Sequence, residues 1–121
     1  FNGFDEWAIQ MLNAACGWSL TKKDWPDLTQ RIALMERCYS MREGYIPLRD
    51  DGLPDRFFDE TVHTKYGEPL KLDREKFLQQ KDTWYSARGL TAEGLPKVAE
   101  LERLGLGFAV PVVEKISKNR Y

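Results

Sequence analysis

Apolar residues recur every three or four positions through the first 44 residues, and this spacing favours helices over other regular structures. A first stripe, ended by Gly17, comprises Phe4, Trp7, Ala8, Met11, Leu12 and Ala15. A second begins after Thr21 and Asp24, which form a short-armed capping box, and closes at Gly44. Its apolar residues are Leu28, Ile32, Met35 and Tyr39, with Leu34, Cys38 and Met41 widening the stripe. The pattern predicts two amphipathic helices, and the second, with Pro26 in its first turn, is expected to be the central element.

Regular spacing is absent from residues 45–72. Ile46-Pro47 and Leu53-Pro54 each favour extended backbone before the proline, and Asp51-Gly52 between them is typical of a turn. Pro54 is placed to open a short helical turn. Residues 60–72 fit either a small hairpin or an ordered loop, and the sequence does not decide between the two.

Helical signals return after residue 72. Asp73 is predicted to cap a helix that runs to Arg88 and ends at Gly89, with an apolar face made of Phe77, Leu78, Trp84 and Tyr85. Leu95-Pro96 is predicted to open a shorter helix, lined by Val98, Leu101 and Leu104. A last turn or two starts at Pro111 and carries Val112, Val113 and Ile116, followed by a frayed, solvated end with Lys115, Lys118 and Arg120.

These elements predict an all-α fold, an irregular bundle of four to five helices with one long irregular connection over about residues 45–72. The 121 residues are expected to form a single helical domain, residues 1–121. Lys and Arg total 18 against 19 Asp and Glu, and this balance argues against a dedicated nucleic-acid binder. No apolar run approaches the roughly 20 residues that a membrane-spanning helix needs, so no membrane partner is expected.

Side chains that could carry chemistry do not assemble into a recognisable site. His63 is the lone histidine and lacks further His or Cys ligands at a regular spacing, so it is interpreted as an inert loop residue. The pairs Asp50-Asp51 and Asp59-Glu60 are interpreted as turn formers and solvated charge, because no calcium-loop pattern surrounds them. We therefore assign no catalytic, cofactor-binding or metal-binding residue.

Cysteine, glycine and tryptophan residues receive structural interpretations. Cys16 and Cys38 lie in helical patterns without the short paired spacings of metal sites, and are expected to be buried or half-buried free thiols. Such sparing use of cysteine fits a reducing compartment and favours a cytoplasmic protein. The glycines form no phosphate-binding motif. Packing in the core or at helix junctions, rather than a ligand platform, is expected for Trp7, Trp18, Trp25 and Trp84.

Four stretches combine cap, turn and terminator residues in a recognisable order. They are Asn13–Thr21, Leu34–Arg37 running into Met41–Gly44, Asp51–Phe57, and Trp84–Thr91 with Gly94–Pro96 and Leu101–Leu106. Together, in this order and at these separations, they resemble the C-terminal region of the aldehyde ferredoxin oxidoreductases, the tungsten-pterin enzymes. The resemblance covers nearly the whole chain, and its specificity comes from the four stretches together rather than from any one of them.

The resemblance implies a parent enzyme that oxidises an aldehyde to a carboxylic acid at tungsten bound by two pterins. Electrons would then pass through a [4Fe-4S] cluster to ferredoxin. In the family, the cluster cysteines and the pterin-contacting segments precede the matched region, and Cys16 stands where the family usually has Thr. The chain is therefore expected to hold no cofactor of its own and to be inactive in isolation.

On this resemblance, the chain is a C-terminal piece of a larger oxidoreductase, and its start at Phe1 rather than Met fits such a piece. Its expected partners are the remaining domains of the parent, and ferredoxin is the expected partner of the parent itself. The piece would wall the cofactor pocket and complete a domain interface. Apolar surface left exposed by the missing domains would favour self-association of isolated copies.

Two alternatives stay open. The first, within the same family, is the related tungsten subunit of an aromatic acyl-CoA reductase of the benzoyl-CoA type. The second is a free-standing helical module that binds a partner protein. An initiating Met and a stop codon around these residues would favour the module, whereas an upstream reading frame with the cysteine motifs would eliminate it.

Overall fold

Helices make up most of the chain that the structure, a computed structural model, describes, namely residues 3–118. Within that range there are seven α-helices, one 3-10 helix and one two-stranded antiparallel sheet. In chain order the elements are α1 (Phe4–Cys16), α2 (Trp25–Arg42), α3 (Pro47–Asp50), α4 (Arg56–Asp59), β1 (Val62–His63), β2 (Pro69–Leu70), α5 (Arg74–Ala87), α6 (Val98–Arg103), η1 (Gly107–Ala109) and α7 (Val110–Lys118). The predicted all-α fold is confirmed.

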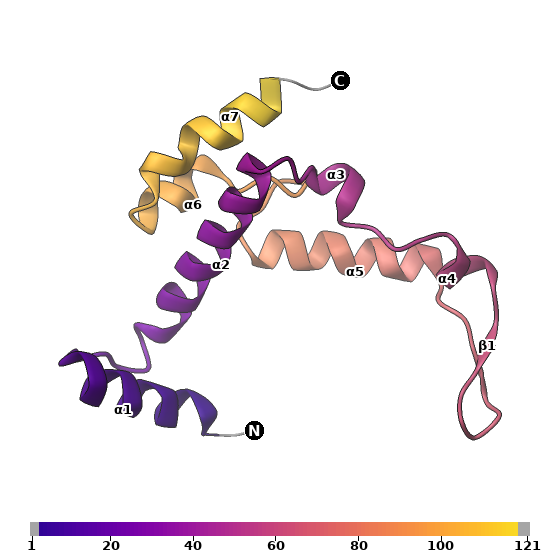
Figure 1. Cartoon of the computed structure of the whole chain (residues 1–121), viewed down its shortest axis with the longest axis horizontal. Helices are drawn as coiled ribbons and strands as arrows, with labels where there is room; N and C mark the ends of the chain where they lie inside the picture. Colours follow the sequence, from indigo (N-terminus) through magenta and orange to yellow (C-terminus); the bar gives the residue numbers. More distant parts are fainter. Residues whose placement is uncertain (1–2, 119–121) are drawn as a thin grey trace.

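The helices form an open arch rather than a closed bundle (Figure 1). α7 packs against α2, α6 lies close to both, and the C-terminal end of α5 reaches the same place. α1 extends from the other end of α2, while α4 and the β1–β2 hairpin lie at the far end of α5. No helix among the described residues is long and apolar enough to cross a membrane.

The hydrophobic core sits where α2, α5, α6 and α7 meet. Its centre is Leu101 and Leu106, whose side chains are fully buried. The cluster also includes Leu34, Cys38, Met41, Tyr85, Leu90, Leu95, Leu104, Ala109 and Val113. α1, α4 and the hairpin contribute no residue to it. The core therefore joins the middle of the chain to its last quarter and leaves both ends of the arch outside.

The α2 helix buries a different face from the one its main stripe predicted. Leu34, Cys38 and Met41 are buried, whereas Ile32, Met35 and Tyr39 expose 51%, 45% and 60% of their surface. The expectation that Ile32, Met35 and Tyr39 would form the main buried face is wrong. α2 carries apolar residues on two opposite faces, and helical spacing alone does not tell which face its own chain covers.

The α1 helix has the predicted bounds, and Gly17 ends it in the left-handed conformation. Much of its predicted apolar stripe, however, is exposed: Phe4, Trp7 and Met11 are each more than half exposed. Ala8 and Leu12 of the stripe are half-buried, and the buried residue of the helix is Ile9. The corner after α1 is fixed by the Asn13 side chain, which donates to the Leu20 carbonyl (2.9 Å) and accepts from the Leu20 amide (2.8 Å).

The start of α2 confirms the capping box while moving the helix boundary. The Asp24 carboxylate accepts from the Thr21 amide (2.7 Å) and the Thr21 hydroxyl (2.6 Å), which is the backward half of a capping box. Residues 22–24 form a turn, so the helix begins at Trp25 rather than directly after Thr21, and Pro26 lies in its first turn as predicted.

The connection between α2 and α5 is more regular than the sequence of residues 45–72 predicted. Ile46 is extended, as expected before a proline, but Pro47 then starts the short helix α3, which the sequence analysis missed. The predicted helical turn is α4. The hairpin alternative for residues 60–72 is confirmed, with Val62 opposite Leu70 and His63 opposite Pro69.

The last helices follow the predicted order with shifted bounds. α6 begins at Val98 rather than at Pro96, because Pro96 pairs with Leu90 in an isolated bridge that keeps this segment extended. α7 is a full helix of nine residues rather than a turn or two, and it carries the exposed Lys115 and Lys118. The expected solvated end also included Arg120, which lies outside the described residues.

The N-terminus of α5 offers a test of helix capping. Asp73 has the predicted role, because its carboxylate accepts from the Lys76 amide at 3.0 Å. Asp73→Ala is expected to lower the free energy of unfolding by about 1 kcal/mol, the usual loss for an N-cap. Urea denaturation followed by circular dichroism measures this loss. Asp82→Ala, an exposed position within the same helix, is the control, and an equal loss there would contradict the capping role.

Candidate functional site

The residues first considered for chemistry lie apart in the structure. His63 is exposed on the hairpin. Asp59 lies 3.8 Å from Arg74, and Glu60 lies 3.9 Å from Arg56, so both form exposed ion pairs. Between residues 3 and 118, no three or more His, Cys, Asp and Glu side chains lie close enough together to hold a metal ion. The interpretation of this acidic pair as solvated charge is confirmed.

Asp50 is a local structural residue, but it belongs to helix α3 rather than to the predicted turn. Its carboxylate forms two bonds with the Arg49 guanidinium, at 2.6 and 2.7 Å, and accepts from the Ile46 amide at 2.8 Å. The bond to Arg49 and then that to the Ile46 amide lower the pKa of Asp50 to about 2. The carboxylate is therefore charged at neutral pH and holds the first turn of α3.

Asp51, by contrast, is the centre of a polar cluster, and its interpretation as solvated charge is wrong. Its side chain is 18% exposed. The carboxylate accepts hydrogen bonds from Tyr85 (2.6 Å) and Tyr45 and pairs with the Arg37 guanidinium. We call Asp51, Arg37, Tyr45 and Tyr85 the Asp51 cluster. It joins α2 and α5 through a residue that belongs to neither helix.

Arg37 is held on several sides within this cluster. Its Nε donates to the Gly94 carbonyl at 2.7 Å, and its guanidinium carbon lies 5.8 Å and 5.6 Å from the ring centres of Tyr45 and Tyr85. Burial, followed by the bond to Asp51, raises the pKa of Tyr85 well above its usual value. The phenol therefore stays protonated and remains a hydrogen-bond donor.

The backbone at Gly94 fits closely against the Asp51 cluster. Gly94 has a φ of +79°, and a Cβ built on it would lie 2.7 Å from Arg37 Nη2 and 2.8 Å from the Tyr85 hydroxyl. Both the left-handed conformation and the missing side chain are thus required at this position. This turn brings residues 91–96 against α2 and α5.

A groove lies next to the Asp51 cluster, and Tyr45 belongs to both. It has a volume of about 590 Å³ and is enclosed by the C-terminal end of α2, the α3 segment, residues 93–95 and α7. Its lining is mainly apolar and includes Met41, Ile46, Leu95, Val112 and Ile116; Arg42, Glu93 and Lys115 add charged groups. This volume is in the range of small-molecule sites.

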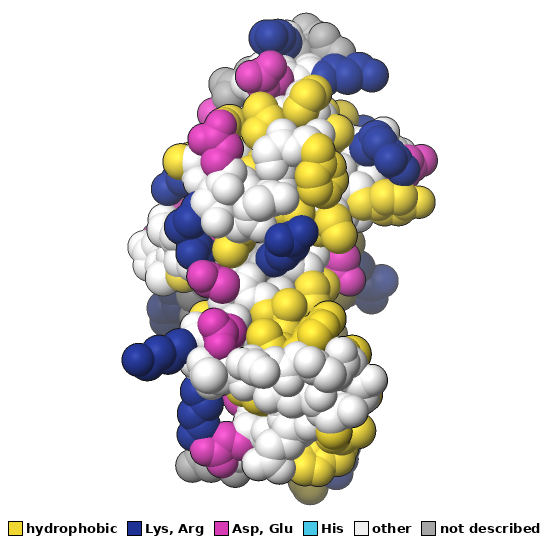
Figure 2. Space-filling view, turned by 90° about the vertical axis from the view of Figure 1, so that its left-hand side faces the viewer, with side chains coloured by type: hydrophobic (Ala, Val, Ile, Leu, Met, Phe, Trp, Pro, Cys, Tyr) yellow, Lys and Arg dark blue, Asp and Glu magenta, His cyan; other side chains and the backbone are white. Residues whose placement is uncertain are grey.

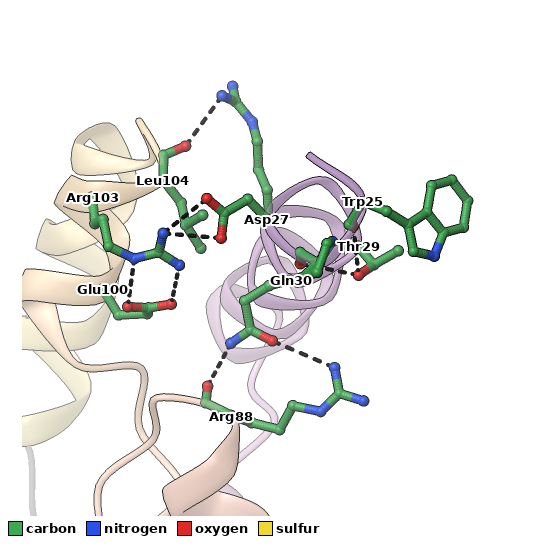
Figure 3. Close-up of polar contacts among 10 residues, drawn as sticks. Trp25, Asp27, Thr29, Gln30, Arg88, Glu100, Arg103 and Leu104 are labelled. Atoms are coloured by element: carbon green, nitrogen blue, oxygen red, sulfur yellow. Dashed lines mark hydrogen bonds and ion pairs between the residues drawn. The ribbon is translucent and has the colours of Figure 1, made fainter. Parts of the chain in front are cut away.

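A separate set of polar contacts fixes the N-terminal half of α2 (Figure 3). Arg103 of α6 binds both carboxylate oxygens of Asp27 at 2.9 Å and also Glu100, at 2.8 and 3.0 Å. Gln30 donates to the Arg88 carbonyl at 2.6 Å, so α2 is tied to the end of α5 as well. Figure 3 shows the Trp25 ring pointing away from these contacts. They join α2 to α6 and to the end of α5 and are therefore interpreted as structural.

The cysteines are free, as predicted, but the expected burial is confirmed only for Cys38 and is wrong for Cys16. Cys38 is buried in the core, and this burial raises the pKa of its thiol, whereas Cys16 is exposed. A thiol reagent at pH 8 is expected to label Cys16 at once and Cys38 only after denaturation, because the protonated, enclosed thiol reacts slowly. Mass spectrometry of the labelled chain measures this. Cys16→Ser is the control, and rapid labelling of that variant would contradict the burial of Cys38.

The tryptophans are less buried than expected. Trp7, Trp18 and Trp84 are each about half exposed, so the expectation of core packing is wrong for these three. Trp25 is partly buried beside the start of α2. Trp84 stacks at a tilt on Tyr85, with ring centres 5.9 Å apart, and so lies at the outer edge of the Asp51 cluster.

A comparison with models of protein families decides the family. The model described as aldehyde ferredoxin oxidoreductase, domains 2 and 3, matches residues 2–106. The chain belongs to this family. The four stretches that carried the resemblance all lie inside the matched range, which begins eleven residues before Asn13 and ends at Leu106.

Individual members of the aldehyde ferredoxin oxidoreductase family agree with the match. The tungsten-containing aldehyde ferredoxin oxidoreductase of Pyrococcus furiosus is 34% identical over 96 residues, which is 79% of this chain and 15% of the relative. That of Pyrococcus horikoshii is 33% identical over 104 residues, 86% of this chain and 16% of the relative. The WOR-like subunit of an aliphatic sulfonate oxidoreductase from P. furiosus is 29% identical over 124 residues, 96% of this chain and 19% of the relative.

The chain thus spans less than a fifth of the length of these curated relatives and corresponds to one part of a larger multi-domain enzyme. The cofactors that the family implies can be tested against its residues. A [4Fe-4S] cluster takes four thiolates, but the sequence has two cysteines, one exposed and one buried in the core. These residues do not fit the cluster.

The Asp51 cluster gives the family-like stretches a physical meaning. Arg37, Asp51, Tyr85 and Gly94 come from the second, third and fourth stretches, which are far apart in the sequence and meet in this cluster. Asn13 and Leu20, which fix the corner after α1, are both in the first stretch. In this chain, the resemblance to aldehyde ferredoxin oxidoreductases rests on residues that hold the fold together.

Proposed function

We propose that the chain is the C-terminal helical domain of a tungsten-pterin aldehyde:ferredoxin oxidoreductase. The parent enzyme would oxidise an aldehyde to a carboxylic acid, with a [4Fe-4S] cluster passing electrons to ferredoxin. In this proposal the cofactors are held elsewhere in the parent, because this chain lacks the thiolates that a cluster needs. Isolated from the parent, the chain would be inactive.

The observation that carries the proposal is the family match over residues 2–106, together with the meeting of three family-like stretches at Asp51. A chance match would have no reason to place these stretches in contact. The tungsten-containing aldehyde ferredoxin oxidoreductases among the relatives favour an aldehyde as the substrate class.

The contribution of this domain to the parent would be structural. The apolar groove beside Tyr45 is formed by α2, the α3 segment, residues 93–95 and α7, and we assign it to the boundary with the cofactor-bearing part. The Asp51 cluster lies next to this groove and fixes Tyr45, so the shape of the groove depends on buried polar contacts rather than on a mobile loop.

The test is the activity and cofactor content of the protein encoded by the reading frame that contains this segment. We expect it to hold iron and tungsten and to oxidise aldehydes with ferredoxin as acceptor. Aliphatic sulfonates and aromatic acyl-CoA esters are the competing substrate classes, and preference for either would reject the aldehyde assignment. Residues 1–121 alone should lack the brown absorbance of an iron–sulfur cluster, and one bound cluster per chain would overturn the proposal.

A further inference from the structure

We infer that the outward apolar stripes of α1 and α2 are the surface on which the remaining domains of the same polypeptide dock. The stripes consist of Phe4, Trp7 and Met11 on α1, and Ile32, Met35 and Tyr39 on α2. We call them the outer stripes. This inference rests on the proposed function, since it takes the occupant from the parent enzyme.

The outer stripes are regular, which separates them from scattered surface hydrophobics. In each helix the three residues occur at i, i+3 and i+7, and so lie on one face. On α2 this face is opposite the one that Leu34 and Met41 bury in the core. Each of the six residues exposes 45% or more of its surface. None of the six is charged, so the surface that covers them must itself be mainly apolar.

The weak attachment of α1 indicates that its exposed apolar residues pack against another surface in the full protein. An isolated helix of 13 residues is marginally stable in water, and packing of an apolar face normally supplies the missing stability. Here the attachment includes one buried residue, Ile9, the half-buried Ala8 and Leu12, the two Asn13–Leu20 bonds and an exposed pair between Glu6 and Lys22. The aromatic face of the helix is not used by the described part of this chain.

The exposed area matches an interface between domains of one chain. Large apolar side chains offer about 150–250 Å² each, so half-exposed, the six give roughly 600 Å². That value is at the lower end of the 600–1,500 Å² that such domain interfaces bury. Figure 2 shows apolar side chains along much of the height of one face of the molecule. Exposed apolar surface of this total extent is unusual for a protein that stands alone.

The occupant is the tethered parent rather than a second copy of this chain. The chain covers 15–16% of the two aldehyde ferredoxin oxidoreductases compared, so most of a relative's length lies in other parts of the same molecule. A domain on the same polypeptide is present at an effective concentration of the order of millimolar. It therefore occupies the outer stripes before a free second copy does.

The test uses the methionines of α2 in the intact parent enzyme. Met35 is 45% exposed in this domain, and Met41, on the same helix, is 2% exposed. Oxidative footprinting gives the oxidation rate of each side chain in the native and in the urea-unfolded enzyme. We expect the rates of Met35, Met11 and Trp7 to be about ten-fold or more lower in the native enzyme, as for the buried Met41. Tyr66, 78% exposed at the hairpin, is the control and should remain rapidly labelled.

Each rate in the native parent is taken relative to that of the same residue in the unfolded enzyme. If Met35 and Trp7 are as little protected as Tyr66, and not protected like Met41, the docking surface is overturned. Protection that appears only with rising protein concentration would also overturn it, in favour of a second copy. These outcomes leave the proposed function intact. If the reading frame instead encodes no cofactor-bearing part, the proposed function itself fails, and this result does not depend on the footprinting experiment.

Discussion

Replacement of Asp51 with Asn is expected to lower the free energy of unfolding by about 2–4 kcal/mol, because it leaves a mostly buried guanidinium without its counter-ion. Asn has the same shape and keeps one acceptor, so the loss reports the charge rather than a cavity. Arg37 is 13% exposed, and solvent therefore does little to compensate. Tyr45 and Tyr85 donate hydrogen bonds to the same carboxylate, and the substitution weakens both bonds.

Urea denaturation measures this loss, with Asp82→Asn on the exposed surface of α5 as a charge-matched control that should change stability by less than about 0.5 kcal/mol. The variant Tyr85→Phe completes a double-mutant cycle with Asp51→Asn. A coupling free energy of about 1 kcal/mol or more is expected, because the two groups share a 2.6 Å bond. Equal losses for Asp51→Asn and Asp82→Asn would mean that the Asp51 cluster does not stabilise the fold.

Gly94→Ala is expected to be at least as damaging, with a loss of about 3 kcal/mol or more. Alanine at a φ of +79° is strained, and its methyl group would approach Arg37 and the Tyr85 ring to less than 3 Å. Relief of that contact requires the Asp51 cluster to move. The change therefore combines backbone strain with disruption of a partly buried polar network.

Gly44→Ala separates these two causes. Gly44 also has a positive φ, +102°, but no atom lies within 4 Å of a Cβ built there. Its substitution should cost only the backbone strain, about 1–2 kcal/mol. Thermal unfolding of both variants gives the comparison. Similar losses at the two positions would show that close packing against Arg37 and Tyr85 adds nothing, and would contradict the crowding seen at Gly94.

Helix positions were largely predictable because the signals that start and stop helices are local. Asp73 caps α5, and Gly17 and Gly89 take the left-handed conformation after α1 and α5. Such signals act within three or four residues, so they can be read from sequence alone. The short helix α3 was missed because four residues contain no full apolar period, and its Asp50 was interpreted only as a turn residue.

The buried face of α2 and the importance of Asp51 depend on distant parts of the chain. The residues near Met35 and Met41 do not tell which of these two methionines is buried by the segment that follows residue 85. Asp51 looks like any turn carboxylate until Arg37 and Tyr85, 14 positions before it and 34 after it, are placed beside it. The family resemblance was the one sequence signal that included all three residues, and it did not indicate that they touch.

The position of the β1–β2 hairpin affects how related chains can differ in length. Residues 62–70 lie at the outer end of the arch, their strands are exposed, and no side chain of the core comes from them. Insertions and deletions there leave every contact of the core in place. We expect the family to vary in length mainly between α4 and α5, and to keep a constant number of residues from Tyr85 to Leu106.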